Sequence, residues 1–296
     1  MSRQNLNYQL YLASKKLKTK LLRKLPLSFV PRQRDLSNTL QIGITTYIDR
    51  YDNFFKPLYL DLLLLFPEVD IFVSVNGFFD QDSQSRYLDR LRNELCNKKS
   101  DSSTFVLHDF PVGLTRLWNE ILSQGNNSTT LLLNDDLRVF PWFRAWIEKN
   151  FWSNNNITLI NGTWSHLFFN RNLFGEIGLF DEDFRGIGFE DMDYTARCGI
   201  KGIEIHNLAC DFIEHKDHQP SRTSFDQISD TLWGPKYSSI NHKYFFWKWR
   251  LSSEYPGVFI KQLDSFVTQN NHVQERSSQY KLNFQNGIYY PDRENP

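Results

Sequence analysis

The sequence predicts one α/β domain built on a mostly parallel central sheet flanked by helices, with a helical leader before it and an aromatic extension after it. Apolar runs of strand length alternate with longer runs of helical pattern, and the joins between them are short, as in βαβ units. Several strand-like runs end abruptly in polar side chains. The 296 residues, 40% of them hydrophobic, suffice for one large core or two modest ones.

The elements follow from their residues in chain order. Strands are expected where β-branched and other apolar residues cluster in short runs, at 41–47, 69–77, 104–108, 130–133, 157–160, 202–206 and 211–214, with a further apolar segment at 164–170. Helices are expected where apolar residues recur at helical spacing, at 54–66, 84–97, from near Pro111, from 141 to about 151, and from 190 onward. Strand, helix and strand with short joins predict a right-handed, parallel arrangement.

The stretch 130–139 combines an apolar run of strand length with polar side chains at its end. Its apolar run ends in Asn134, Asp135 and Asp136, and ligands of open α/β sheets bind at the carboxyl ends of strands. Adjacent carboxylates repel each other, so a cation usually keeps them ionised, and their oxygens suit Mg²⁺ or Mn²⁺. We expect Asp136 to be an exposed acid at the sheet edge that contributes little to the core. A strand ending in an Asx-capped turn would give the same pattern.

A second acidic cluster, 190–193, favours the metal interpretation. It follows a loop in which Gly186 and Gly188 permit a tight turn and close approach of a ligand. The acids fall in the first turn of the expected helix, where the helix dipole favours negative charge. For Asp193 we prefer this capping role.

The charge is unevenly distributed along the chain. Residues 1–34 hold nine Lys and Arg and no acid, so the remaining chain carries a formal charge of −9. The leucines at 10–25 recur at roughly helical spacing among these lysines, which is typical of a basic helix that lies on an anionic membrane surface. A leader helix that packs on its own domain explains the pattern equally well.

The location of the protein is expected to be cytoplasmic. The three cysteines have no C-x-x-C spacing and cannot all pair, and 1–9 is polar with no apolar core after it, so we expect a reducing compartment and no secretory signal. The segment 237–250 is too aromatic for a solvated tail. It either packs on the core, which we prefer, or forms a wall that faces an acceptor or a membrane.

An ordered set of motifs resembles the glycosyltransferases of GT-A fold, in particular the family-2-like inverting enzymes and related galactosyltransferase-type domains with an ED motif. The motifs are a strand ending in Thr46-Tyr47, a strand ending in Asn76-Gly77, Gly113-x-x-Arg116-x-x-Asn119, Asn134-Asp135-Asp136, and Phe180-Asp-Glu-x-Phe-x-Gly-x-Gly-x-Glu-Asp. A later Asn241-x-x-Tyr244-Phe-x-x-Lys248-Trp249 is similar to a segment near the end of many bacterial members. Asn134 departs from the usual first aspartate of the DxD motif, and Asn76 replaces an aspartate that many relatives use for the nucleotide base.

The resemblance implies a role for each matching residue. It implies that Asp136 binds Mn²⁺ or Mg²⁺ with His215, for which His218 is the rival. Asp191 would be the catalytic base of an inverting transfer, and Glu190 and Gly188 would bind the acceptor. The donor-binding residues would be Thr45, Tyr47, Asn76, Arg116, Asn134 and Asp135.

The resemblance also implies partners and boundaries. The donor would be a nucleotide-diphosphate sugar, expected to be a UDP-sugar. The acceptor would be a hydroxyl of a glycan or lipid-linked glycan in capsule, lipopolysaccharide or other surface polysaccharide synthesis, and no nucleic acid is expected to bind. The expected divisions are a leader at 1–38, a catalytic domain at 39–220 with a nucleotide-sugar half (about 39–140) and an acceptor half (about 141–220), and an extension at 221–296. The leader would lie near the inner face of the cell membrane.

Two other functions remain open. Sugar-phosphate nucleotidyltransferases also place acids at a parallel-sheet edge, but they begin with a glycine-rich basic loop, which 42–50 lacks. A sugar- or nucleotide-binding relative without turnover is the alternative that is not an enzyme, and the departure at Asn134 favours it.

Overall fold

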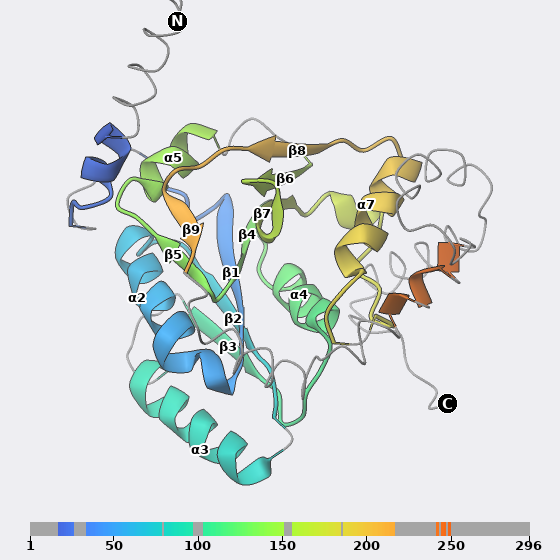
Figure 1. The fold of residues 1–296 in the computed structure, drawn as a ribbon, viewed down its shortest axis with the longest axis horizontal. Coiled ribbons are helices and arrows are strands. Elements are labelled where there is room, and N and C mark those ends of the chain that lie inside the picture. Colours follow the sequence, from blue (N-terminus) through green and yellow to red (C-terminus); the bar gives the residue numbers. More distant parts are fainter. Residues whose placement is uncertain are drawn as a thin grey trace, which may run out of the picture.

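The chain forms an α/β fold around a seven-stranded sheet, with a two-stranded sheet beside it (Figure 1). This computed structural model describes residues 17–26, 34–78, 80–96, 103–150, 156–184, 186–216 and 241–249 without 243 and 247. The large sheet contains β1 (Leu40–Thr46), β2 (Ile71–Val75), β3 (Ser103–Leu107), β4 (Thr129–Asn134), β6 (Ile157–Ile160), β7 (Thr163–Asn170) and β8 (Ile205–Leu208). The small sheet pairs β5 (Leu137–Val139) with β9 (Ile213–His215).

The strand order of the large sheet is β3-β2-β1-β4-β7-β6-β8. β7 runs antiparallel to both of its neighbours, and every other pair in this sheet is parallel. The predicted α/β class with a mostly parallel central sheet is therefore confirmed. The antiparallel β7 was expected only as an apolar segment, because a hairpin partner cannot be distinguished from a parallel strand by its own residues.

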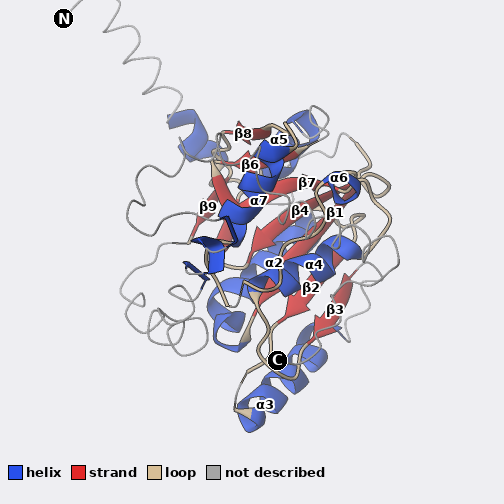
Figure 2. Cartoon of the chain, turned by 90° about the vertical axis from the view of Figure 1, so that its right-hand side faces the viewer, coloured by secondary structure: helices blue, strands red, loops and turns tan. Residues whose placement is uncertain are grey.

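Helices cover both faces of the sheet (Figures 1 and 2). They are α2 (Lys56–Leu65), α3 (Gln81–Leu91), α4 (Leu114–Ser123), α5 (Phe143–Asn150), α6 (Leu173–Glu176) and α7 (Glu190–Ile200), with a 3₁₀ turn at Ile48–Arg50 and π-helical turns at Tyr51–Phe55 and Arg92–Cys96. α2, α3 and α5 pack in one core, and α4, α6 and α7 pack in another. The sheet thus separates two hydrophobic layers.

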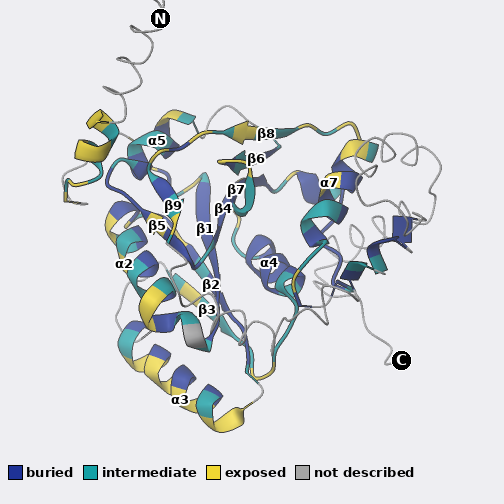
Figure 3. Ribbon diagram, viewed as in Figure 1, coloured by how far each residue is buried: buried dark blue, intermediate teal, exposed yellow. Residues whose placement is uncertain are grey.

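The alternation of side chains along β4 connects these two layers. Leu131 and Leu133 belong to the core on the α2 face, whereas Leu132 belongs to the core on the α4 face, as the two-residue period of a strand requires. On β1, Gly43 allows α4 to approach closely, because a Cβ atom there would lie 2.1 Å from Cγ2 of Ile121. The central strands β1 and β4 are buried, whereas the edge strands β3 and β8 and the outer faces of α2 and α3 are partly exposed (Figure 3).

The strands after α7 begin later than expected. The prediction of a strand at 202–206 is corrected to 205–208, because the residues after α7 end the helix instead of extending the sheet. Gly202 has φ +66, and the N–H of Ile203 donates to the carbonyl of Cys198, a typical helix-terminating turn. The strand expected at 211–214 is found at Ile213–His215.

The described residues of the leader, 17–26 and 34–38, include a short helix, 17–22, next to the small sheet. Arg23 forms an ion pair with Glu214 at 2.6 Å and lies over the ring of Phe140. Leu17 and Leu21 are exposed, at 61% and 59%. One end of the leader therefore packs on its own domain, and a membrane role for its apolar residues stays a prediction. In the part of the chain that the structure describes, no helix is long and apolar enough to span a bilayer.

Candidate active site

Polar side chains from neighbouring strands meet at the carboxyl edge of the large sheet. The register pairs Thr45 of β1 with Ser74 of β2 and with Asn134 of β4, so the three strands end level with one another. The pocket at this edge is lined by Thr45, Thr46, Tyr47, Arg50, Asn76, Leu114, Leu117, Asn134, Asp135 and Ile187. It brings together the predicted donor-binding residues Thr45, Tyr47, Asn76, Asn134 and Asp135.

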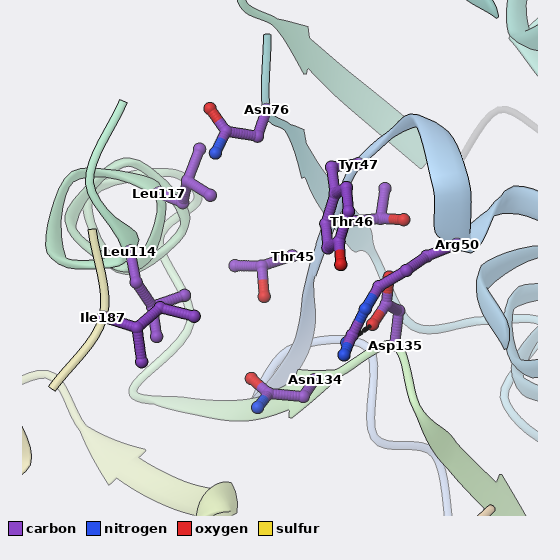
Figure 4. A pocket seen from close by; sticks show the side chains of 10 residues that line it. All are labelled: Thr45, Thr46, Tyr47, Arg50, Asn76, Leu114, Leu117, Asn134, Asp135 and Ile187. Atoms are coloured by element: carbon purple, nitrogen blue, oxygen red, sulfur yellow. Dashed lines mark hydrogen bonds and ion pairs between the residues drawn. The ribbon is translucent and has the colours of Figure 1, made fainter. Parts of the chain in front are cut away.

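The pocket has an apolar and a polar side (Figure 4). Leu114, Leu117 and Ile187 form one wall, and Tyr47 and Arg50 form the opposite wall, with Thr45 and Asn134 between them. The space inside the pocket, together with its opening to solvent, is about 560 Å³. The arrangement suits a ligand with a flat or apolar part and a polar part.

Two asparagines of the pocket have different environments. The side-chain oxygen of Asn76 accepts hydrogen bonds from the N–H groups of Gly77 and Val112, and its Nδ2 donates to the carbonyl of Val112. Asn76 therefore fixes the chain that leads into α4. Oδ1 of Asn134, in contrast, is buried without a hydrogen-bond partner. A buried acceptor of this kind is costly to leave unsatisfied, which favours a donor group or cation from a ligand at Asn134.

Arg50 is the cation that faces the two aspartates. Its Nη1 contacts Oδ1 of Asp135, and its Nη2 lies 3.5 Å from Oδ2 of Asp136. Burial raises the pKa of Asp135 to about 6, although Arg50 opposes this shift. No role was predicted for Arg50 from the sequence. The available indication was its position just after β1, at the same sheet edge as two acids that need a counter-charge.

Asp136 and His215 lie together, as the resemblance implied. Leu137 of β5 pairs with His215 of β9, so the histidine is brought beside the residue that precedes β5. Nδ1 of His215 is 3.7 Å from Oδ1 of Asp136. The expectation of an exposed acid was wrong: Asp136 is only 7% exposed, because the small sheet and Arg50 cover it. His218 lies outside the described residues.

A second histidine, which the sequence analysis missed, packs against the first. Leu133 of β4 pairs with His166 of β7, and the rings of His166 and His215 are 5.4 Å apart. Oγ of Ser165 lies within hydrogen-bond distance of both rings. Burial lowers the pKa of His166 to about 4, so its ring is neutral at neutral pH. His166 and Ser165 thus fix the orientation of His215.

The residues around Asp136 fit a divalent cation when a ligand supplies the rest of the coordination. Among the described residues, no three His, Cys, Asp or Glu side chains form a metal-binding group. Mg²⁺ is commonly held by one or two protein carboxylates together with substrate phosphates and water. One carboxylate oxygen and one imidazole nitrogen 3.7 Å apart provide such a partial site.

The second acidic cluster begins α7 after a strained loop. Gly186 and Gly188 have φ +65 and +113, and Phe189 also has a positive φ, +71. A left-handed residue other than glycine persists only where its surroundings hold it, and such residues cluster at functional sites. Ile187 of this loop lines the pocket. Gly188, Glu190 and Asp191 are not among the lining residues, so the acids begin where the pocket wall ends.

Burial perturbs both carboxyls of the acidic pair. Glu190 is buried and accepts a hydrogen bond from the N–H of Gly188. Burial, with a smaller contribution from the Asp191 charge, raises the pKa of Glu190 to about 8. Burial also raises the pKa of Asp191, while hydrogen bonding to the backbone opposes the shift. A carboxylate with a raised pKa is a stronger base, which suits proton abstraction near neutral pH.

We expect Glu190→Gln to stabilise the protein at alkaline pH. Because the folded-state pKa of Glu190, about 8, lies above its ordinary value of 4.5, its stabilising contribution is complete below pH 4.5 and is lost as pH rises through 8. Glutamine carries no such dependence. The Tm difference between Glu190→Gln and wild type should therefore be more positive at pH 9 than at pH 5. Each kcal/mol of change in the free energy of unfolding shifts the Tm by roughly 2–4 °C.

Differential scanning calorimetry at the two pH values measures this effect. Glu176→Gln is the matched control, because Glu176 is exposed on α6. A Tm difference between Glu190→Gln and wild type that is the same at pH 5 and pH 9 would contradict the raised pKa.

Three further residues considered from the sequence also lie outside the pocket. Arg116 does not line it, and its Nε is 3.8 Å from Oε1 of Glu120, so its donor-binding role stays a prediction. Asn119 is buried and links α4 to Phe180. Its Nδ2 donates to the carbonyl of Phe180, and its Oδ1 accepts a hydrogen bond from the N–H of the same residue. Asp193 does not act as a simple helix cap, since it is fully buried and forms ion pairs with Arg197 and Lys248.

No family model and no curated protein match the sequence. Solved structures similar to the chain include TarS from S. aureus, at 12% identity over 84% of this chain and 55% of that chain, with a TM-score of 0.43. They also include the mannosyltransferase PcManGT from Pyrobaculum calidifontis in complex with GDP-Man and Mn²⁺, at 11% identity over 94% of each chain and TM-score 0.45. GalNAc-T7 with UDP, GalNAc and Mn²⁺ is a third, at 12% identity over 88% of this chain and 62% of that chain, TM-score 0.46.

This chain spans about half the length of the TarS chain. The identities are far below 25% and the TM-scores are below 0.5, so the similarities do not assign a function to the chain.

Proposed function

We propose that the protein is a glycosyltransferase that moves a sugar from a nucleotide-diphosphate donor to a hydroxyl of a glycan or glycolipid. One observation carries the proposal: a pocket at the carboxyl edge of β1, β2 and β4 is lined by Asp135 and Arg50 of a charged cluster with Asp136 and His215, and by Ile187 of the loop just before a second acidic pair at the start of α7. The first pair suits a diphosphate with its cation, and the second suits proton transfer.

The pocket chemistry supports a nucleotide as the donor part. The apolar wall of Leu114, Leu117 and Ile187 can pack against a base, and Thr45 and Asn134 can hydrogen-bond to ribose or base. Arg50 has the planar donor fork that recognises phosphate in a bidentate manner. Asp135 and Asp136 both contact this fork, so we infer that Arg50 shares its contacts between the acids and the diphosphate.

We infer that Asp136 and His215 would hold Mn²⁺ or Mg²⁺. A divalent cation there would neutralise the charge that develops on the leaving diphosphate. The protein residues that prepare this site are His166 and Ser165, which orient the His215 ring, and Arg50, which contacts both Asp135 and Asp136.

In the proposed reaction, Asp191 is the general base. Its carboxylate takes the proton of the acceptor hydroxyl while that oxygen forms a bond to the anomeric carbon, and the bond between the anomeric carbon and the diphosphate oxygen breaks. Nucleoside diphosphate leaves, and the product has the inverted configuration, because the attack is in line with the leaving group. Glu190 and the Gly188 backbone would bind the acceptor beside Asp191.

The finer assignments follow from the same proposal. Surface polysaccharide synthesis, such as that of capsule or lipopolysaccharide, would take place at the cytoplasmic face of the membrane. The basic leader, with exposed Leu17 and Leu21, suits a chain that works beside anionic lipids.

A binding protein without turnover is the second candidate. The observation that favours it is Arg50, which places a protein cation against both aspartates where an active enzyme would need a divalent ion. Such a protein would bind nucleoside diphosphate without Mn²⁺ and would not hydrolyse nucleotide sugars.

A thermal-shift screen of UDP, GDP, CDP and ADP, each with and without Mn²⁺, tests the proposal. We expect one diphosphate to stabilise the fold, with a larger shift when Mn²⁺ is present. A ligand at about 100 times its Kd adds roughly 2.7 kcal/mol to native stability. Equal shifts with and without Mn²⁺ would support the binding protein, and no shift with any diphosphate would contradict both candidates.

A further inference from the structure

A helical segment near the end of the described chain, 241–249, packs against the loop that precedes the acidic pair. Figure 1 shows this segment in orange beside α7. Its aromatic residues Phe245, Phe246 and Trp249 form a separate core with Phe184 and Ala196. The preferred expectation that the aromatic extension packs on the core thus holds for the described part of 237–250.

Asn241 connects this segment to Gly188, two residues before Glu190. Asn241 is fully buried, and its Nδ2 donates to the carbonyl of Gly188 at 2.9 Å. The N–H of the same residue, Gly188, donates to Oε2 of Glu190. The carbonyl and the N–H of Gly188 are therefore both fixed, one by the distant segment and one by the first acid of α7.

The next residue, Phe189, is held from the same side. Its backbone has the left-handed φ of +71, and its ring packs at 5.5 Å from Phe245 and 5.3 Å from His242. A left-handed residue with a side chain persists only where the surrounding structure holds it in that conformation. The segment supplies such surroundings, and Phe189 is the residue from which α7 starts.

Buried charges attach the segment to both sides of the loop. Nζ of Lys248 lies 2.6 Å from Asp181 and 2.6 Å from Asp193. Nε1 of Trp249 donates to Asp193, and the Tyr244 hydroxyl donates to Asp181. Since Asp181 precedes the loop and Asp193 follows it, the two ion pairs of Lys248 connect the two ends of the loop.

We propose that Asn241 is a positioning residue for the acidic pair Glu190 and Asp191, and that segment 241–249 is thereby a part of the active site. The catalytic role of the acidic pair in this inference rests on the proposed function. The placement of the acids themselves can be measured without any reaction. The burial that keeps Glu190 from water should depend on the Gly188 carbonyl being held.

The test uses the full chain with Asn241→Ala, and Asn93→Ala as the matched control, because Asn93 is exposed on the Arg92–Cys96 turn. NMR with ¹³C-labelled glutamate follows the titration of Glu190, and hydrogen exchange follows the amides of 189–192. We expect Asn241→Ala to lower the Glu190 pKa from about 8 toward its ordinary value. Hydrogen exchange at these amides should become about fivefold to tenfold faster, which corresponds to the loss of one buried hydrogen bond.

A global fold defect is distinguished by a second variant. Phe245→Leu leaves the Asn241 hydrogen bond in place but removes the ring that faces Phe189, so a smaller change in the same direction is expected. If both variants melt cooperatively, and both keep the wild-type Glu190 titration and the wild-type exchange of 189–192, the positioning role is overturned. Lys248 is unsuitable for substitution, because its loss would leave buried carboxylates without a counter-charge.

Kinetics then separate this inference from the proposed function. Hydrolysis of UDP-glucose, UDP-N-acetylglucosamine and GDP-mannose is measured with Mn²⁺ for the wild type and both variants. A lower kcat with unchanged KM in Asn241→Ala supports both the positioning role of Asn241 and the proposed glycosyltransferase function. Altered Glu190 titration, with no hydrolysis of any donor by the wild type and no diphosphate binding, leaves the positioning of the acids established and overturns the glycosyltransferase.

Discussion

Replacing Asp136 with asparagine is expected to abolish Mn²⁺-dependent binding of nucleoside diphosphate. Asp136 places a carboxylate oxygen 3.7 Å from Nδ1 of His215, and these two atoms are the protein ligands of the proposed cation site. Loss of a residue that merely supports a metal ligand costs roughly 10–100-fold in affinity, so loss of the ligand itself should cost at least about 100-fold. Because Asp136 is buried, asparagine is preferred to alanine, since it keeps the side-chain volume.

Isothermal titration calorimetry with the diphosphate that gives the largest thermal shift, with and without Mn²⁺, measures this loss. Asp89→Asn is the matched control, because the Asp89 side chain is 71% exposed on α3. His215→Ala should weaken the same binding less severely. Unchanged affinity of Asp136→Asn in Mn²⁺ would exclude a metal role for this carboxylate.

The parts of the site that the sequence predicted depend on local pattern and strand direction. Thr45, Asn76 and Asn134 each follow or end an apolar run of strand length, and parallel strands bring their ends to one edge. Side-chain pattern and the parallel rule together therefore suffice to place them in one pocket. The start of α7 at Glu190 was predicted for a similar reason, because glycines precede it and acids fill its first turn.

The missed parts depend on contacts between residues far apart in the chain. Arg50 meets Asp135 and Asp136 across 85 and 86 positions, and its position just after β1, the one local indication, does not show which acids its side chain contacts. The burial of Asp136 depends on the pairing of β5 with β9, two strands of three residues each. Strands this short carry too few residues to show a period, so their register cannot be predicted from sequence.

The contacts that position the acidic pair also join residues far apart in the chain. Asn241 reaches Gly188 across 53 positions, and its aromatic neighbours were expected only to pack somewhere on the core. Composition predicts that such residues are buried, because aromatic side chains lose large areas of contact with water when they pack. It does not predict which loop they hold.

Asp191→Asn is expected to lower the transfer rate by about 10²–10⁴-fold, the usual contribution of a positioned general base. Asparagine keeps the size of the side chain and can still accept the hydrogen bond that Oδ1 of Asp191 takes from the N–H of Met192. It cannot take the acceptor proton. Binding of donor and Mn²⁺ should survive, because Asp191 does not line the pocket.

The pH dependence of the wild-type rate provides a second measurement of the same role. A general base acts only when deprotonated, and burial raises the pKa of Asp191 above its ordinary value of 3.8. The rate should therefore fall, as pH is lowered, at a higher pH than an exposed aspartate would give. In Asp191→Asn this acid limb should disappear, whereas Glu190→Gln should act mainly through acceptor affinity.

Donor affinity by calorimetry, transfer rate, and the anomeric configuration of the product by NMR are the three readouts for these variants. Asp89→Asn again serves as the control for an aspartate far from the site. Two results would overturn the mechanism: a wild-type transfer rate in Asp191→Asn, or a product that retains the configuration of the donor sugar. Retention would require either a nucleophile on the protein or attack from the leaving-group side, and in-line attack by an acceptor oxygen that Asp191 deprotonates permits neither.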